Sequence, residues 1–299
     1  MILKNNHLSS FTTLRIGGPA SALFEASDPD AVVLSARRAE SIGLPWRVIG
    51  QGSNILASDA GVAGAVIVFQ GGEAPQAGPE GLVRVLGSTS LDDLVGFMVE
   101  RGLGGLEALA GIPGTVGGAI CGNAGAYGTA IGERISRVTL LGRGGEVREV
   151  NARELEFGYR HSIIKESREA VLEALIEARP ADPAVLRKTM KEKQSDRAAK
   201  HPNHRVTPTA GSWFKNIRQP DGTMTAAGRL LDEAGCRELV VGGASLWPRH
   251  ANIVVTDGRA TFAEVDALVS EMARRVEERF DIKLVEEVCR LAPPAKAPA

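Results

Sequence analysis

A glycine-rich run over residues 111–128 places the strongest constraint on how this chain folds. It reads Gly-Ile-Pro-Gly-Thr-Val-Gly-Gly-Ala-Ile-Cys-Gly-Asn-Ala-Gly-Ala-Tyr-Gly, with seven glycines and no charged side chain. Glycine loses more backbone entropy on folding than any other residue, so such density indicates a backbone that turns sharply or approaches a ligand closely. Because the run has no Lys or Arg, an anion bound here would be held by backbone N–H groups. The run therefore favours a phosphate-bearing ligand held by main chain.

Length, charge and cysteine content narrow the class of protein. The 299 residues allow two domains, each able to bury a core. A net charge of −1 gives no indication of nucleic acid or an anionic membrane as partner. Three cysteines without a CxxC pair favour a reducing cytoplasm over a disulfide framework. We expect no signal peptide, no membrane-spanning helix and, from the histidine spacing, no metal site.

Helix and strand signals alternate irregularly along the chain. Helices are predicted after Asp28-Pro29 up to Gly43, after Ser90 up to Gly102, and after the capping box Thr261–Glu264. Strand-like runs occupy residues 46–49, 82–86, 138–141, 147–150, 171–178, 239–241 and 253–256. Short strands interrupted by isolated helices favour an α+β fold over a regular βαβ series.

A charged helical segment at residues 182–200, which follows Pro180, is the predicted domain boundary. It divides the chain into domains at 1–180 and 181–290. The last residues, 291–299, are rich in proline and alanine and are predicted to form a disordered tail.

The familiar nucleotide-binding motifs are missing from this sequence. Neither G-x-G-x-x-G nor G-x-x-x-x-G-K-[ST] occurs, which disfavours a Rossmann domain and a P-loop ATPase. A second glycine turn, Gly50-Gln-Gly-Ser-Asn54, offers hydroxyl, amide and backbone donors to a phosphate. On its own it is ordinary turn chemistry. Together with the run at 111–128 it indicates that a dinucleotide diphosphate is held from more than one side.

Six motifs in order along residues 10–290 resemble the UDP-N-acetylenolpyruvoylglucosamine reductase family. The resemblance rests on residues 13–20 (TLRIGGPA), 50–54 (GQGSN), 111–119 (GIPGTVGGA), 157–162 (FGYRHS), 210–216 (AGSWFKN) and 284–288 (LVEEV). It implies an α+β chain with an FAD-binding domain of the vanillyl-alcohol-oxidase (PCMH) type, in two subdomains, at 1–180. It also implies a smaller α+β substrate-binding domain at 181–290, whose last strand returns Glu287 to the active site.

The resemblance also implies the cofactor contacts. FAD would be bound non-covalently, with NADPH as hydride donor. The implied FAD-binding residues are Arg15, Gly50, Gly52, Ser53, Asn54, Gly111, Ile112, Pro113, Gly114, Thr115, Gly117, Gly118 and Ala119.

Reduction of an enolpyruvyl ether needs a hydride donor, a group that stabilises the enolate and a proton donor. No amino acid donates hydride, so a redox cofactor is required. The guanidinium of Arg160 suits a carboxylate, although the residues alone favour an ordinary surface arginine. Ser212, by sequence a simple turn cap, corresponds to the family's proton donor. Glu287, by sequence half of a solvated pair, corresponds to its catalytic glutamate.

The implied substrate-binding residues are Tyr159, Lys215, Asn216 and His250. The sequence departs from the family pattern at Val285, Ile217 and Trp247, so the substrate contacts are less firmly implied than the FAD contacts. The short spacing between Arg160 and Ser212 resembles the shorter, second type of the family. In that type, the basic stretch at 200–205 is a candidate to cover the diphosphate, with a mobile loop as its alternative.

The predicted function is the NADPH-dependent reduction of UDP-N-acetylglucosamine enolpyruvate to UDP-N-acetylmuramate, for peptidoglycan synthesis. The chain is expected to act in the cytoplasm as a monomer, with only its UDP-linked substrate and NADPH as partners. Two alternatives remain. One is another FAD-dependent oxidoreductase of this scaffold acting on a small alcohol or hydroxy acid. The other is a nucleotide-binding module without turnover.

Overall fold

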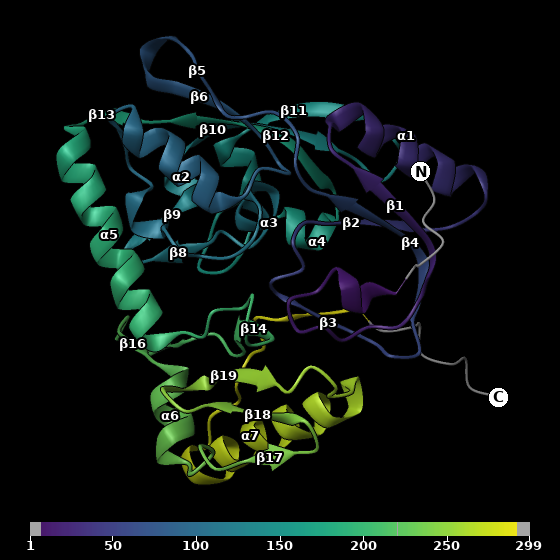
Figure 1. Ribbon diagram of the computed structural model, residues 1–299, viewed down its shortest axis with the longest axis vertical. Helices are drawn as coiled ribbons and strands as arrows, with labels where there is room; N and C mark the ends of the chain where they lie inside the picture. Colours follow the sequence, from purple (N-terminus) through teal and green to yellow (C-terminus); the bar gives the residue numbers. More distant parts are fainter. Residues whose placement is uncertain (1–6, 220, 292–299) are drawn as a thin grey trace. The chain divides into compact units, whose positions relative to one another are not determined.

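The computed structural model describes residues 7–219 and 221–291, which form two compact units. The larger unit comprises residues 21–51 and 64–197, and the smaller unit comprises residues 7–20, 52–63 and 198–291, apart from 220. Helices and strands are mixed in both, which confirms the α+β class (Figure 1). Residues 292–299 of the predicted tail lie outside the described residues.

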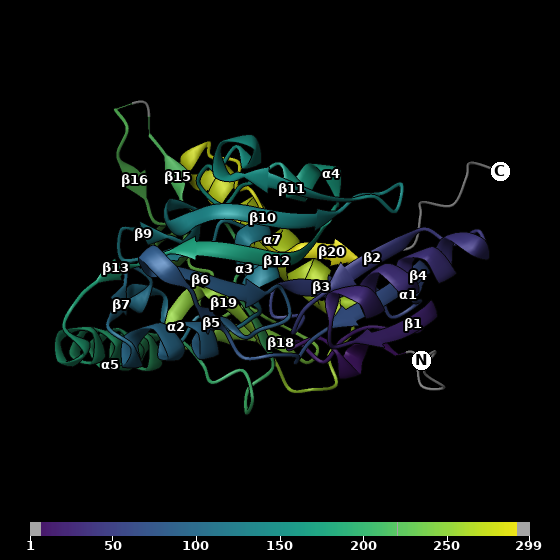
Figure 2. The same cartoon turned by 90° about the horizontal axis from the view of Figure 1, so that it is seen from above.

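An antiparallel five-stranded sheet is the centre of the larger unit, in the order β11-β10-β12-β6-β5 (Figure 2). The strands are β5 (Gln76–Ala77), β6 (Leu82–Leu86), β10 (Ile135–Leu141), β11 (Val147–Asn151) and β12 (Ala170–Glu177). Val83, Val138 and Ile176 are fully buried in its core. The burial follows from the apolar, β-branched runs that predicted these strands.

A second sheet of the larger unit has the order β1-β4-β2, with β2 and β4 parallel. Its strands are β1 (Ala20–Ala26), β2 (Trp46–Ile49) and β4 (Val62–Phe69). The remaining strands pair in twos: β7 (Leu103–Gly104) with β13 (Arg179–Pro180), and β8 (Gly125–Ala126) with β9 (Thr129–Ala130).

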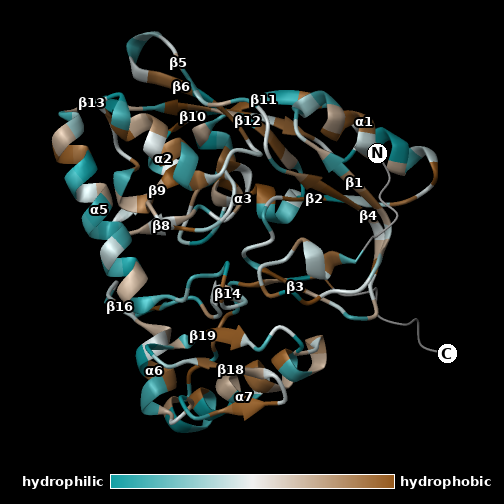
Figure 3. Cartoon of the chain, viewed as in Figure 1, coloured by the Kyte–Doolittle hydropathy of each residue, from teal (hydrophilic) through white to brown (hydrophobic). Residues whose placement is uncertain are grey.

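The helices of the larger unit are α1 (Pro29–Ser41), α2 (Leu91–Glu100), α3 (Val116–Cys121), α4 (Ile164–Ser167) and α5 (Pro183–Lys200), the last of which continues three residues into the smaller unit. Asp28 caps α1 by accepting a hydrogen bond from the Ala31 N–H at 2.8 Å, and Ser90 caps α2 through the Asp93 N–H at 3.0 Å. Both predicted helix starts are confirmed. Helix α5 is polar along most of its length (Figure 3).

The smaller unit is built on a four-stranded sheet in the order β14-β19-β18-β17. Its strands are β14 (Thr209–Ser212), β17 (Val240–Val241), β18 (Ala244–Trp247) and β19 (His250–Thr256). Two further pairs of strands lie outside this sheet: β15 (Ile217–Arg218) with β16 (Met224–Thr225), and β3 (Ile55–Ala57) with β20 (Cys289–Leu291). The helices are α6 (Ala227–Glu233) and α7 (Phe262–Phe280).

Helix α7 confirms the predicted capping box, in which Thr261 and Glu264 bond each other's backbone N–H groups. Its apolar stripe, Val265, Leu268, Val269, Met272 and Val276, is buried. In the described part of the chain, no helix combines the length and apolar composition needed to cross a bilayer.

Candidate functional site

The glycine-rich run leads into the short helix α3 in the larger unit. Thr115 caps this helix by accepting the Gly118 N–H at 3.3 Å. The turn that precedes α2 binds the two amides that follow Thr115. The Val116 N–H donates to the Thr89 carbonyl at 2.8 Å, and the Gly117 N–H donates to the Gly87 carbonyl at 2.9 Å. The run therefore has a fixed backbone path set by two neighbouring segments.

The two glycine motifs meet within the larger unit. A Cβ on Gly50 would lie 2.3 Å from Thr115 Oγ1, so only glycine permits this approach. The Gln51 side-chain carbonyl accepts the Gly114 N–H at 3.1 Å. The structure therefore brings Gly50 beside Gly114 and Thr115, as expected of two walls of one phosphate site.

Two buried hydroxyls beside the glycine run have no hydrogen-bond partner among the described residues. They are Ser88 Oγ and Thr89 Oγ1, on residues only 2% and 7% exposed. Buried hydroxyls are normally satisfied, so unpaired ones indicate a missing partner. An uncharged cradle of backbone and hydroxyl groups fits a flavin dinucleotide, whose diphosphate and polyol chain both accept hydrogen bonds. The residues present thus fit FAD.

The remaining residues of the second motif lie in the smaller unit. Gly52 has φ +61°, and its carbonyl accepts the Thr13 N–H at 3.2 Å. The side-chain amide of Asn54 donates to the Glu287 carbonyl at 3.1 Å. Asn54 therefore connects a predicted FAD-binding loop to a predicted catalytic residue.

Ser212 and Glu287 belong to adjacent segments of the smaller unit. The Glu287 N–H donates to the Trp213 carbonyl at 2.7 Å, and the Lys215 N–H donates to the Val285 carbonyl at 2.8 Å. Trp213 is fully buried, whereas Ser212 is half-buried.

The neighbour of Glu287 is fixed by an ion-pair network. Arg290 donates from Nε and a terminal nitrogen to the two Glu286 carboxylate oxygens, at 2.8 and 2.7 Å, and it also pairs with Asp266 of α7. A bidentate pair of this kind restricts both side chains. The Glu286 carboxylate is therefore committed to Arg290.

Arg160 lies in the larger unit with a positive φ of +52° and donates to the Gly125 carbonyl at 2.8 Å. It is therefore tied to the glycine-rich run. A second guanidinium, that of Arg197 on α5, interacts electrostatically with it. Burial is the main cause that lowers the pKa of Arg197 below its usual value, and the Arg160 charge adds to the effect.

Arg197 packs directly on the start of the glycine run. A Cβ on Gly111 would lie 3.1 Å from Arg197 Cδ, and the Gly111 N–H donates to Asp92 at 2.6 Å. The Arg197 Nε is buried without a hydrogen-bond partner among the described residues. Beside it on α5, Asp196 accepts the Tyr127 hydroxyl at 2.7 Å. Arg160 and Arg197 therefore both lie beside the run, and a guanidinium is suited to an anionic ligand.

The predicted substrate-binding residues have distinct surroundings. Tyr159 is 48% exposed, beside Arg160. The Asn216 side-chain carbonyl accepts the Ala227 N–H at 3.1 Å, so this residue also anchors the start of α6. His250 is half-buried, and its Nδ1 accepts the Asn252 N–H at 3.2 Å. Burial is the main cause that lowers the pKa of His250, and the charges of Arg237 and Lys200 act in the same direction.

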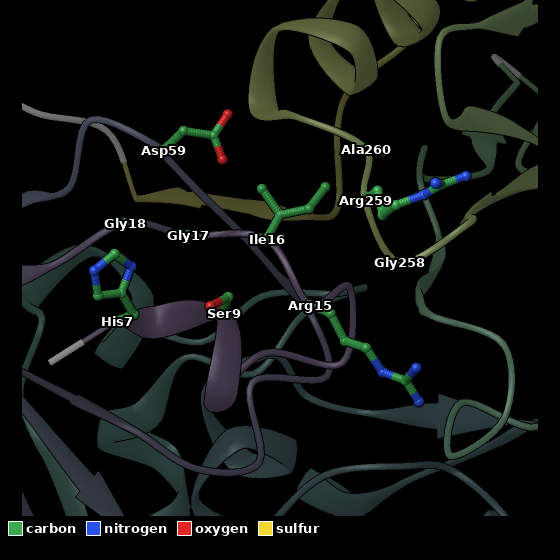
Figure 4. A pocket seen from close by; sticks show the side chains of 10 residues that line it. All are labelled: His7, Ser9, Arg15, Ile16, Gly17, Gly18, Asp59, Gly258, Arg259 and Ala260. Atoms are coloured by element: carbon green, nitrogen blue, oxygen red, sulfur yellow. The ribbon is translucent and has the colours of Figure 1, made fainter. Parts of the chain in front are cut away.

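A separate cavity of about 270 Å³ in the smaller unit is lined partly by Arg15 (Figure 4). The Arg15 guanidinium donates to the Arg205 carbonyl at 2.8 Å, and Arg259 pairs with Asp257. The Asp59 carboxylate accepts the Phe262 N–H at 2.6 Å. These polar groups are engaged within the protein and point in different directions, so the cavity gives no support to a ligand. The role of Arg15 in FAD binding stays a prediction.

Within residues 7–219 and 221–291, no three His, Cys, Asp or Glu side chains are grouped as metal ligands. Cys121, Cys236 and Cys289 form no disulfide with one another.

These features define an FAD-binding protein, and residues 20–151 match the family described as FAD binding domain. Residues 201–291 match UDP-N-acetylenolpyruvoylglucosamine reductase, C-terminal domain. The chain is 38% identical over 289 residues to the UDP-N-acetylenolpyruvoylglucosamine reductase of Pelobacter propionicus, covering 96% of this chain and 95% of that protein. It is 35% identical to the same-named protein of Heliobacterium modesticaldum, covering 96% and 89%. The chain therefore belongs to the UDP-N-acetylenolpyruvoylglucosamine reductase family.

A solved structure agrees with this assignment. The crystal structure of UDP-N-acetylenolpyruvylglucosamine reductase from Thermus caldophilus superimposes with a TM-score of 0.78 at 32% identity, covering 95% of this chain and 97% of that one. The predicted fold class, an FAD-binding domain followed by the C-terminal domain of the reductase family, is confirmed at the level of these families.

Sequence reasoning missed several residues of the site. Ser88 and Thr89 precede the cap residue Ser90, so in sequence they are part of a helix start. Arg197 lies in a charged helix whose composition indicates only a domain boundary. The sequence signal for Arg197 was its spacing of four residues from Lys193, because residues four apart share one face of a helix. In the structure, the Lys193 ammonium lies 4.5 Å from the centroid of the Tyr127 ring.

Proposed function

We propose that this protein reduces UDP-N-acetylglucosamine enolpyruvate to UDP-N-acetylmuramate, with NADPH as reductant and bound FAD, in the cytoplasmic synthesis of peptidoglycan precursors. The observation that carries the proposal is the likeness to reductases of this name over 96% of the chain, with both family domains in order. Supporting it are the uncharged glycine cradle and the residues Ser212 and Glu287 on bonded segments. That the protein is a monomer stays a prediction, which light scattering tests.

The protein's own groups have separable tasks in this proposal. FAD, when bound, supplies hydride transfer between NADPH and the substrate. Hydride reaches the terminal methylene carbon of the enolpyruvyl group, and negative charge develops toward the carboxylate. Arg160 would stabilise that charge with its guanidinium, and Glu287 would do so as a protonated carboxyl that donates a hydrogen bond. The Ser212 hydroxyl would deliver the proton to the neighbouring carbon and regain one from solvent. Arg197 adds a second cation on the Arg160 side.

Substrate recognition is assigned to the remaining predicted residues. Lys215, Asn216 and His250 lie in the smaller unit and contact the UDP-sugar, while Tyr159 lies beside Arg160. A buried guanidinium such as that of Arg197 is weakly hydrated, which favours pairing with a carboxylate or phosphate of the substrate. The basic stretch at 200–205, which Arg15 contacts through the Arg205 carbonyl, remains the candidate cover for the diphosphate.

The test follows the flavin absorption of the purified protein without oxygen. NADPH should bleach the flavin bands, and the UDP-linked enolpyruvate should restore them. UDP-N-acetylglucosamine, which lacks the enolpyruvyl group, is the matched control and should restore nothing. Bleaching by a small alcohol or hydroxy acid in place of NADPH would identify the other oxidoreductase. Failure to bind FAD would refute both.

A further inference from the structure

Asn252 is a buried polar residue that the proposed chemistry does not use. It lies on β19, only 2% exposed, and its side chain is fully engaged with one residue. Its Oδ1 accepts the Phe214 N–H at 2.9 Å, and its Nδ2 donates to the Phe214 carbonyl at 2.8 Å. The Asn252 carbonyl also accepts the Trp213 N–H at 2.7 Å. One residue thus holds three successive peptide groups, two of them through its side chain.

The side chain takes this role because the strand ladder stops nearby. Strand β14 pairs with β19 at Ser212 and Ile253 after an irregularity that follows Thr209. Gly211, within the irregularity, has φ +76°. The Trp213 N–H still donates to a backbone carbonyl of β19, but at Phe214 a side-chain amide replaces the backbone partner that a regular strand would offer. Buried backbone groups need such partners, since leaving them unpaired is costly.

The segment held by Asn252 connects three predicted site residues. Ser212 precedes Trp213, and Lys215 follows Phe214. The Trp213 carbonyl accepts the Glu287 N–H, and Phe214 forms an isolated bridge with Glu286. On the far side, Asn54 holds the Glu287 carbonyl. A chain of hydrogen bonds therefore runs from the main-chain carbonyl of Asn252 through Trp213 to Glu287 and Asn54, and the side-chain amide of Asn252 holds the next residue, Phe214.

We infer that Asn252 is a positioning residue, whose amide fixes the Trp213–Phe214 backbone and thereby sets the Ser212 hydroxyl relative to the Glu287 carboxylate. The inference rests on the proposed function for the roles of Ser212 and Glu287. Asn252 acts through the backbone and does not touch the substrate. A displacement of about 1 Å of a reacting group costs about 100-fold in rate, so the amide has a measurable task.

The test variant is Asn252→Asp in the FAD-loaded enzyme. The shape is kept, but an oxygen replaces the nitrogen that donates to the Phe214 carbonyl. Flavin reduction by NADPH should stay within about twofold of the wild type, while reoxidation by the enolpyruvyl substrate should fall about 100-fold. The loss should shrink at low pH, because a protonated aspartic acid again donates a hydrogen bond.

Thr256→Val is the matched control, because it removes a buried side-chain hydrogen bond to the Leu14 carbonyl from the same strand without contacting residues 212–215. Its two half-reactions should match the wild type. Equal losses in both half-reactions of Asn252→Asp, or reoxidation at the wild-type rate, would overturn the inference. The same loss in Thr256→Val would also overturn it, because strand stability alone would then explain the effect.

Amide hydrogen exchange separates this inference from the proposed function. In Asn252→Asp, the Trp213 and Glu287 amides should exchange at least roughly tenfold faster, while the Thr256 amide keeps its protection. Unchanged exchange overturns the inference whether or not the enzyme turns over. A wild-type enzyme that the enolpyruvyl substrate does not reoxidise refutes the proposed function instead, and faster exchange would still support the anchoring role of Asn252.

Discussion

A serine hydroxyl is a weak acid in water, so the proposed role of Ser212 depends on its surroundings. It lies at the end of β14, where the backbone continues into a segment bonded to Glu287. Ser212→Ala should leave flavin reduction by NADPH intact and slow reoxidation by the substrate roughly 10²- to 10⁴-fold. Stopped-flow absorbance measures both rates. Ser245→Ala, on β18 of the same sheet, is the control; equal loss in both half-reactions of Ser212→Ala would contradict the role.

The neutral state of His250 predicts a pH effect on stability. Because burial lowers its pKa, the unfolded chain binds a proton on this imidazole at a pH where the folded chain does not. The unfolded state then holds more protons, so the free energy of unfolding falls as pH drops below the usual histidine pKa of about 6.5. Urea unfolding at several pH values should show a weaker decline in His250→Gln. An equal decline in both proteins would mean that other groups carry the effect.

At the scale of single residues, the sequence pointed to the proposed catalytic residues but not to the residues that hold the backbone around them. Arg160, Ser212 and Glu287 were predicted because family motifs mark them, and their roles remain predictions. Asn252 and Arg197 were not predicted, since their importance arises from contacts with residues far along the chain. A buried asparagine that completes a broken ladder leaves no local pattern in sequence.

Elements were predictable where local rules decide them. The caps at Asp28, Ser90 and Thr261 specify helix starts through their own side chains, and all three are confirmed. Strand β6 has the predicted bounds, 82–86. The two-residue strands β8, inside the glycine run, and β9, directly after it, were not predicted, because their pairing depends on the turn between them and on no hydrophobic alternation.

The turn at Gly52 gives a prediction at the scale of an element. Its φ is +61°, and a Cβ would lie 2.0 Å from the Phe11 carbonyl oxygen. Gly52→Ala should therefore lower the free energy of unfolding by more than the roughly 1–2 kcal/mol that a left-handed backbone alone costs. It should also lower the FAD content of the purified protein. Thermal denaturation and the flavin-to-protein absorbance ratio measure the two effects.

Gly43→Ala separates strain from close approach in that experiment. Gly43 follows α1 with a similar φ of +70°, but a Cβ added there would meet no heavy atom within 4 Å. It should lose stability from strain alone and keep its FAD. If both alanine variants behaved alike, the packing of Gly52 against Phe11 would have no special importance.

For the whole molecule, sequence order and spatial order differ. The sequence predicts a single division of the chain, at residue 180. The compact smaller unit, however, also contains residues 7–20 and 52–63. Leu14, Ile16 and Leu56 share its core with Trp213. Such recruitment is invisible in sequence, because an apolar residue does not show which core it joins. The division into an FAD domain and a substrate domain at 180/181 stays a prediction about function.

FAD removal tests how far the cofactor stabilises the folded chain. A ligand that binds only the native state adds stability by mass action, about 2.7 kcal/mol at a free concentration of 100 times Kd. The FAD-free protein should therefore melt at a lower temperature, and FAD should restore the Tm in a concentration-dependent way. Riboflavin is the control, because it lacks the diphosphate for which the glycine cradle and the hydroxyls of Ser88 and Thr89 are suited. Riboflavin should restore less than FAD does; equal restoration would show that the isoalloxazine ring alone carries the binding and that the cradle at Gly50 and Thr115 serves only to join two turns.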